Sequence, residues 1–344
     1  MPMWIRTLLS GLALALCASS ALASVGLQEW PANALSGPIT LFYPSQATAS
    51  NTQRDGFAMP LAVNAPPLPG NRKLIVMSHG SPASPWVHFD LAQTLVEAGF
   101  TVALPEHFAD HAKDDSDPGP PSWKRRPQEI SRAIDRLQQD ARFAALDFAH
   151  IGLFGMSAGG HTALTLAGGR WSAARLRDHC EGNLEQDFHA CAGLSVTLTG
   201  GLLDGLKKWL VLTINAYKLS DASWHEHTDP RIVAIVSGVP FAADFDPASL
   251  RQPKAALAII SARQDQWLIP RFHSDAVLAA CPPCTHLADL PNAGHGALLG
   301  PLPPHPPGRL AQLIADSATF DRRLEMPKLN RTITDYFSDK LLPR

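Results

Sequence analysis

One serine in this chain lies in a pattern that suits nucleophilic catalysis. The motif Gly-Met-Ser-Ala-Gly, residues 155–159, follows an apolar run at 150–154 and opens a helical pattern. Glycines two residues before and after Ser157 are what a sharp, crowded turn between a strand and a helix requires. Such a turn lifts the hydroxyl above the edge of a sheet, and the start of the helix favours negative charge that develops nearby. We therefore predict that Ser157 is a nucleophile.

A serine hydroxyl needs a base to take its proton. In a strand–turn–helix setting the acid and the histidine follow the serine in that order, each just past a strand. Asp265 follows the apolar run at 256–260, and His295 lies in Asn-Ala-Gly-His-Gly after the next predicted strand. We predict that His295 is the base and that Asp265 orients it. Asp244, which follows the preceding strand, is the alternative acid.

The intermediate of acyl transfer carries an oxyanion, which needs N–H donors already in place. The amide of Ala158, directly after the nucleophile, is one expected donor. The other is the amide of Ser81, in the loop Ser-His-Gly-Ser (78–81) that follows a buried strand. We interpret His79 in this loop as a brace, not as a proton carrier. His161, one helical turn after Ser157, is expected to pack and not to act as the base.

Four side chains near these loops are expected to wall a substrate pocket. For the two tryptophans among them, packing in the core is the alternative. The four are His79, Trp86, Met156 and Trp267.

Short apolar runs alternate with helical patterns along the chain. Predicted strands lie at 39–43, 73–77, 101–104, 150–154, 232–236, 256–260 and 285–290, and predicted helices at 86–98, from Pro127 to about 141, 157–167, 271–280 and 333–341. This alternation predicts an α/β protein, a mostly parallel sheet with helices on both faces. We assign residues 24–344 to one domain.

A long stretch interrupts this order at about 168–230, between two strands of the one predicted sheet. More than 50 residues is far longer than an ordinary connection. We predict an inserted helical cap or lid. One alternative is that it only covers an edge of the core. Another is that its apolar helical run docks on a membrane surface, although only Lys207 and Lys208 supply positive charge there.

The first 23 residues are typical of a secretory signal peptide. Arg6 precedes an apolar run at 8–16, and Ala-Leu-Ala ends at Ala23. An uncleaved N-terminal anchor is the alternative. We expect an exported protein, periplasmic or secreted.

Four cysteines remain after residue 23, an even number that predicts disulfides in an oxidising compartment. The local pairs Cys180–Cys191 and Cys281–Cys284 are the simplest of the three possible connectivities. Their spacings do not form two zinc knuckles.

Composition excludes some classes of function. The chain has 344 residues with 29 Lys and Arg against 31 Asp and Glu, for a net charge of −2, which argues against a nucleic-acid binder. No Gly-rich nucleotide loop is present, and the Asp-rich stretch at 110–117 lacks the pattern of a calcium loop, so it indicates a solvated loop. We expect no cofactor and no metal.

These motifs together resemble the α/β-hydrolase superfamily over residues 36–342. They are Ser-His-Gly-Ser at 78–81, Arg126-Pro127, Gly-Met-Ser-Ala-Gly-Gly at 155–160, Asp265 and Gly-His-Gly at 294–296. Within it, the chain is similar to exported dienelactone-hydrolase-like and platelet-activating-factor-acetylhydrolase-like proteins. Dienelactone hydrolases proper use cysteine where this chain has Ser157. The acetylhydrolase branch can place its acid after the earlier strand, where Asp244 lies.

The resulting hypothesis is a serine hydrolase that cleaves carboxylic esters through an acyl-enzyme. Its substrates would be small esters, lactones or lipid acyl esters. The alternatives are a serine peptidase of the same fold and a non-catalytic envelope binding protein that keeps a hydrolase-like pocket.

Overall fold

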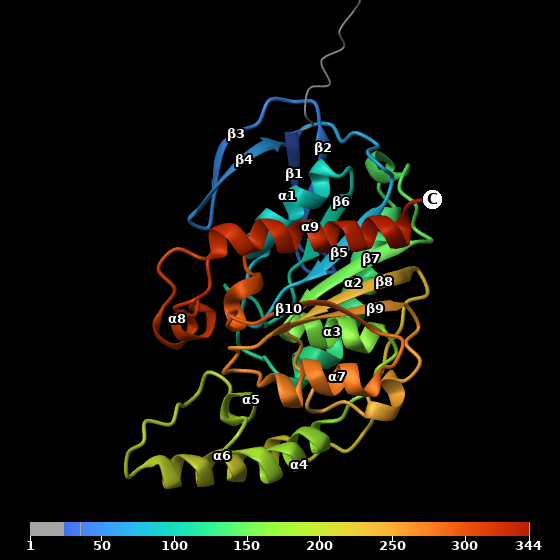
Figure 1. Cartoon of the computed structure of the whole chain (residues 1–344). Coiled ribbons are helices and arrows are strands. Elements are labelled where there is room, and N and C mark those ends of the chain that lie inside the picture. The colour runs from blue at the N-terminus through green and yellow to red at the C-terminus, as the bar shows by residue number, and fades with distance from the viewer. Residues whose placement is uncertain (1–23, 35, 344) are drawn as a thin grey trace, which may run out of the picture.

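The computed structural model describes residues 24–34 and 36–343, so the predicted signal peptide lies outside the described residues. A ten-stranded sheet runs through them in the order β10-β9-β8-β7-β5-β6-β2-β1-β4-β3 (Figure 1). The strands are β1 (Ser24–Trp30), β2 (Ile39–Ser45), β3 (Ser50–Arg54), β4 (Phe57–Val63), β5 (Leu74–Ser78), β6 (Thr101–Pro105), β7 (Ile151–Met156), β8 (Ile232–Gly238), β9 (Ala256–Ala262) and β10 (Thr285–Leu290). From β10 to β6 all neighbours are parallel, which confirms the predicted α/β class.

Helices cover both faces of this sheet. The helices of the described residues are α1 (Phe89–Glu97), α2 (Pro120–Gln138), α3 (Ala158–Leu166), α4 (Ala173–Asn183), α5 (Phe188–Ala192), α6 (Asp204–Lys218), α7 (Ser274–Ala280), α8 (Gly308–Ile314) and α9 (Arg322–Leu341). One apolar cluster joins α1 and α9 to one face, and a second joins α2, α3 and α7 to the other. The central strands β5 and β7 are buried along their whole length, as expected for parallel strands between two helical layers.

The sequence predicted a helix that starts at Pro127. In the structure helix α2 begins at Pro120, so Pro127 lies inside the helix. The physical reason is that Pro120 and Pro121 already occupy the first helical positions, where no N–H is needed. Helix α9 likewise begins earlier than predicted, at Arg322. Asp321 caps it by accepting hydrogen bonds from the next amides.

The segment from 168 to 230, which we call the insert, contributes α4, α5 and α6 between α3 and β8. It lies beyond α3 and α7 on one side of the sheet (Figure 1). The Cys180–Cys191 disulfide joins α4 to α5, and the Cys281–Cys284 disulfide follows α7. Both predicted local pairs are therefore present.

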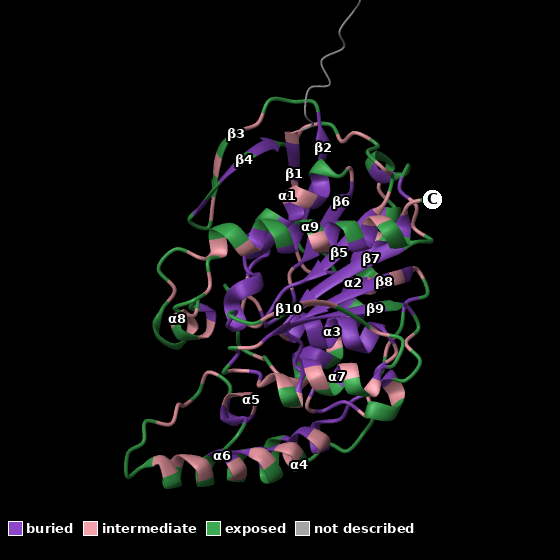
Figure 2. Cartoon of the chain, in the orientation of Figure 1, coloured by how far each residue is buried: buried purple, intermediate pink, exposed green. Residues whose placement is uncertain are grey.

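Helix α6 presents apolar side chains to solvent. Leu206, Trp209 and Ile214 are exposed, whereas Val211 and Asn215 are buried against the rest of the insert. Most of α6 is accordingly coloured as exposed or intermediate in Figure 2. No helix among the described residues is long and apolar enough to span a membrane.

Candidate active site

Ser157 occupies the tight turn between β7 and α3, with a φ of 58°. Residues other than glycine rarely adopt a positive φ, so the surrounding structure must hold the backbone of Ser157 in this conformation. A Cβ at Gly155 would lie 2.0 Å from the carbonyl oxygen of Gly159, and one at Gly159 would lie 1.9 Å from that of Ser78. The crowding of this turn therefore explains both glycines of the motif.

Three polar side chains meet in one hydrogen-bonded chain. The Nε2 atom of His295 lies 3.0 Å from the Oγ atom of Ser157, and its Nδ1 atom lies 2.7 Å from Oδ2 of Asp265. Asp265 follows β9 and His295 follows β10, so the loops at one edge of the sheet bring them together. With the proton on Nδ1 directed at the carboxylate, Nε2 is left to accept the proton of the serine hydroxyl.

The second oxygen of the Asp265 carboxylate is also bound. Its Oδ1 atom accepts hydrogen bonds from the amides of Trp267 and Leu268, at 2.8 and 2.9 Å. Asp265 is buried, and these bonds fix its side chain while Oδ2 faces His295. A buried carboxylate with both oxygens satisfied holds one orientation.

Asp244, the alternative acid, makes its side-chain hydrogen bond elsewhere. Its Oδ2 atom lies 3.0 Å from Nε2 of His161, and both residues are fully buried. The imidazole of His161 stacks on Trp123 with ring centres 4.7 Å apart and contacts Trp171 edge to face. Asp244 thus belongs to a second His–Asp pair, inside an aromatic cluster.

The two residues whose amides are expected to hold an oxyanion, Ser81 and Ala158, lie close to Ser157. Ala158 is the first residue of α3, and Ser81 follows β5; both line the same cavity as Ser157. Within residues 24–34 and 36–343, neither amide donates a hydrogen bond to another group. Both are therefore available to a ligand.

A buried ion pair supports the loop that carries Ser81. The guanidinium of Arg126 donates hydrogen bonds to the carbonyl oxygens of His79 and Gly80, at 2.6 and 3.4 Å, and pairs with Asp110 at 2.7 Å. Asp110 also accepts a hydrogen bond from the hydroxyl of Ser81. Asp110 is fully buried, so its expected place in a solvated loop was wrong: Arg126 supplies the charge that allows its burial.

His79 lies within this loop and not in the cavity. Its Nδ1 atom bonds the carbonyl of Gly80 at 2.7 Å, and its Nε2 atom accepts the amide of His107. Burial, with nearby His107 and Arg126, lowers the pKa of His79 well below its usual value. The side chain is therefore a neutral part of the loop.

A cavity of about 930 Å³ opens beside Ser157 and His295. The core contributes Trp267 to its wall, and the insert contributes His189 and Leu219. The rings of Trp267 and His189 pack against each other at a tilt of 33°, with their centres 4.1 Å apart. The cavity therefore lies between the sheet and the insert.

Trp86 and Met156, which the sequence placed near a pocket, do not line this cavity. Met156 shares a strand face with Phe154 because side chains alternate along a strand, and that face is covered by α1 and α9. Trp86 packs edge to face on Phe42 in the same cluster. Of the four expected pocket residues, the cavity is lined by Trp267.

Comparison with known proteins identifies the fold of this chain. No protein-family model and no curated protein matches this sequence. Among solved structures, the chain is similar to a ferulic acid esterase from Streptomyces cinnamoneus, with a TM-score of 0.58 and 15% identity over 95% of this chain and 92% of that one. Together with the strand order, this likeness shows the α/β-hydrolase fold.

Proposed function

We propose that this protein is an exported serine hydrolase that cleaves carboxylic esters through an acyl-enzyme. The observation that carries the proposal is the continuous hydrogen-bonded chain Ser157–His295–Asp265, whose Ser157 and His295 line a cavity. The order of these residues along the chain is the one that this fold uses for Ser–acid–His catalysis. The similar solved structure is itself an esterase, which supports the same class of reaction.

The reaction follows from the geometry. Ser157 Oγ attacks the ester carbonyl as its proton passes to Nε2 of His295, and the amides of Ser81 and Ala158 hold the oxyanion. The intermediate collapses, His295 returns the proton to the departing alkoxide, and the acyl group stays on Ser157. Water then attacks the acyl-enzyme with His295 again as base. Asp265 stabilises the imidazolium at both stages.

The volume and lining of the cavity indicate the size and polarity of the substrate. A volume of about 930 Å³ is large enough for an ester of drug-like size, and its aromatic and apolar lining suits an apolar acyl or alcohol group. Small esters, lactones and lipid acyl esters all fit this description. In this proposal the insert acts as a cap that completes the pocket.

Export fits two features of the chain. The two disulfides are typical of an oxidising compartment, and residues 1–23 have the pattern of a signal peptide. We place the protein in the periplasm or outside the cell.

A panel of p-nitrophenyl esters of graded acyl length tests the proposal. The purified protein should hydrolyse them, and Ser157→Ala should lose nearly all of that activity together with labelling by a fluorophosphonate probe. Ser338→Ala, on α9 and outside the site, is the matched control. Cleavage of peptide amides without esters would favour the peptidase, and a wild-type protein that neither turns over nor labels would favour the binding protein.

A further inference from the structure

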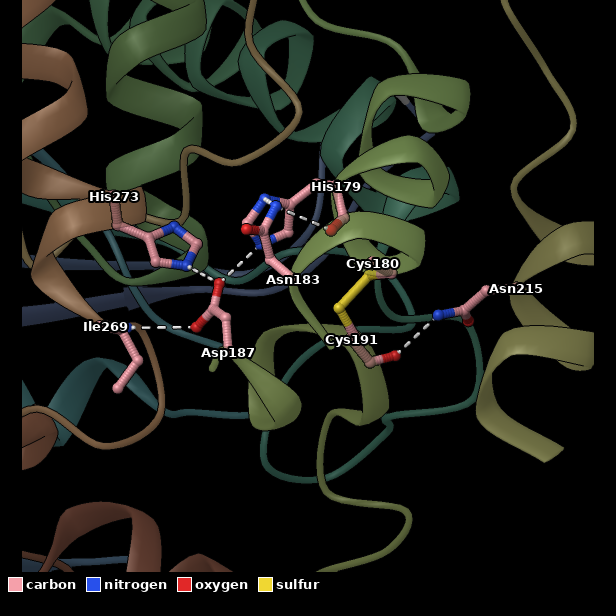
Figure 3. Close-up of a disulfide and its surroundings, with 8 residues drawn as sticks. All are labelled: His179, Cys180, Asn183, Asp187, Cys191, Asn215, Ile269 and His273. Carbon is pink, nitrogen blue, oxygen red and sulfur yellow. Dashed lines mark hydrogen bonds and ion pairs between the residues drawn. A yellow bond between two sulfur atoms is a disulfide. The ribbon is translucent and has the colours of Figure 1, made fainter. Parts of the chain in front are cut away.

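The disulfide of the insert closes a short segment that we call the strap, residues 180–191. The strap runs from the end of α4 through a turn to α5, and Cys180 and Cys191 join its ends (Figure 3). Asp187, at the start of α5, is fully buried. Its side chain points away from the disulfide toward the core of the molecule (Figure 3).

Three donors converge on the carboxylate of Asp187. Nε2 of His179, on α4, lies 2.8 Å from its Oδ2 atom, and Nε2 of His273, just before α7, lies 3.0 Å from the same atom. The amide of Ile269 donates to Oδ1 at 3.3 Å. Burial raises the pKa of Asp187, but the hydrogen bonds from both histidines outweigh it and lower the pKa to about 2.

The direction of these bonds is fixed. The amide of Ala242 donates to Nδ1 of His273 at 2.9 Å, so the ring proton is on Nε2 and is donated to Asp187. His179 is held from its other side by Asn183, whose side chain also bonds the His179 carbonyl at 3.1 Å. Asp187 thus links the insert to the core with one carboxylate.

The loop that Asp187 grips is the one that carries Asp265. Within residues 265–269, the amides of Trp267 and Leu268 bind Asp265 itself, and the next amide, Ile269, binds Asp187. The strap contacts this loop a second time, where the ring of His189 packs against that of Trp267. The strap therefore contacts the loop of Asp265 at two points, Ile269 and Trp267.

We propose that Asp187 is a positioning residue: through the amide of Ile269 and the ring of His273 it holds the acid loop so that Asp265 meets His295. This rests on the proposed function. The insert then contributes to the reaction rate as well as to the pocket wall. The disulfide keeps the two ends of the strap together while Asp187 holds the loop.

The test compares kcat and KM for a small ester, p-nitrophenyl acetate, and for a bulky one that reaches the insert. Rates are expressed per active site titrated with the fluorophosphonate probe, so that unfolded protein does not count. Asp187→Ala should lower kcat about 10- to 100-fold for both esters, because a displacement of about 1 Å has effects of that size. KM for the acetate should stay near its wild-type value.

Matched variants separate positioning from loss of structure. Asp229→Ala removes another buried carboxylate, which pairs with Arg231 outside the site, and should leave kcat per titrated site unchanged. Asp187→Asn keeps one carbonyl oxygen for the amide of Ile269 and should fall between wild type and Asp187→Ala. The low-field NMR signal of the His295–Asp265 proton should weaken in the Asp187 variants and not in Asp229→Ala.

The two disulfides provide the second comparison. Cys180→Ser/Cys191→Ser should lower kcat in the same direction as Asp187→Ala, and Cys281→Ser/Cys284→Ser should not. A change in KM for the bulky ester alone, or equal losses in Asp187→Ala and Asp229→Ala, would overturn the positioning role. Wild-type protein that does not label at all would instead refute the proposed function.

Discussion

Two of the buried His–Asp pairs, His295–Asp265 and His161–Asp244, differ in what the second ring nitrogen of the histidine contacts. In the pair of His295 and Asp265 that nitrogen lies 3.0 Å from the Ser157 hydroxyl. In the pair of His161 and Asp244 it is buried without a hydrogen-bond partner among the described residues. A His–Asp pair is therefore not a base by itself. What matters is whether a nucleophile faces its free nitrogen.

The two pairs also differ in the elements that carry them. His295 and Asp265 follow strand ends, where loops on a rigid sheet place reacting groups. His161 is inside α3, and its ring is enclosed by Trp123 and Phe245. The second pair therefore belongs to the packed interior and not to the site around Ser157. The predictions below test this division of roles.

The largest effect is expected for the two histidines. His295→Ala should lower kcat on an aryl ester about 10⁶-fold, because among the described residues His295 is the base that bonds the serine hydroxyl. His161→Phe keeps the ring volume and should retain activity within a few-fold. Steady-state kinetics of both variants, with circular dichroism to verify folding, checks this. Comparable losses in the two variants would contradict the division.

Substitutions of Asp265 and Asp244 should differ in the same way as those of the two histidines, with a smaller loss of kcat. Asp265→Asn keeps the shape of the side chain but can hold the wrong tautomer of His295, and should lower kcat about 10⁴-fold. Asp244→Asn should change kcat little. Should Asp244→Asn prove the more damaging of the two, the acid assignment would have to be reversed.

Sequence predicted the sheet and the three residues of the hydrogen-bonded chain because their signals are local. A glycine-flanked serine after a buried strand has one steric explanation. Asp265 ranks above Asp244 because a longer segment with a proline separates Asp244 from the end of its strand. Asp110 and Asp187 had no such signal. Each is an ordinary acidic residue in a polar stretch until a distant partner, Arg126 or His273, is folded against it. Trp86 was predicted near the pocket because it follows the loop of Ser81 in the sequence. Closeness along the chain did not show on which face of the sheet its side chain packs.

Another buried histidine, His88, has no acid partner among the described residues and extends the comparison to pH. Both ring nitrogens of His88 lack a hydrogen-bond partner among the described residues, and burial lowers its pKa from 6.5 to about 4. Between these values the unfolded chain binds a proton that the folded protein does not, so stability falls as the pH drops. This difference amounts to about 3 kcal/mol at pH 4.

His88→Leu removes that proton-binding site and should make the free energy of unfolding less dependent on pH. Urea denaturation at pH 7.5 and pH 4 measures the change for wild type and variant. The loss of stability between the two conditions should be smaller by about 3 kcal/mol in His88→Leu. An identical loss in both proteins would show that His88 is protonated without cost in the folded state.

The smallest expected effect is on the free energy of unfolding, in variants that change one or both members of the His161–Asp244 pair. Asp244→Ala leaves the Nε2 proton of His161 buried without an acceptor and should lower the free energy of unfolding by about 1–3 kcal/mol. His161→Phe/Asp244→Leu removes both polar groups from an aromatic cluster and should be close to neutral, since an apolar replacement of both partners leaves nothing unsatisfied. The double-mutant cycle from urea denaturation gives the coupling between the two residues directly. A double variant less stable than either single variant would mean that the pair itself stabilises the fold. A loss of esterase activity in the double variant would mean that the His161–Asp244 pair also acts on the site around Ser157.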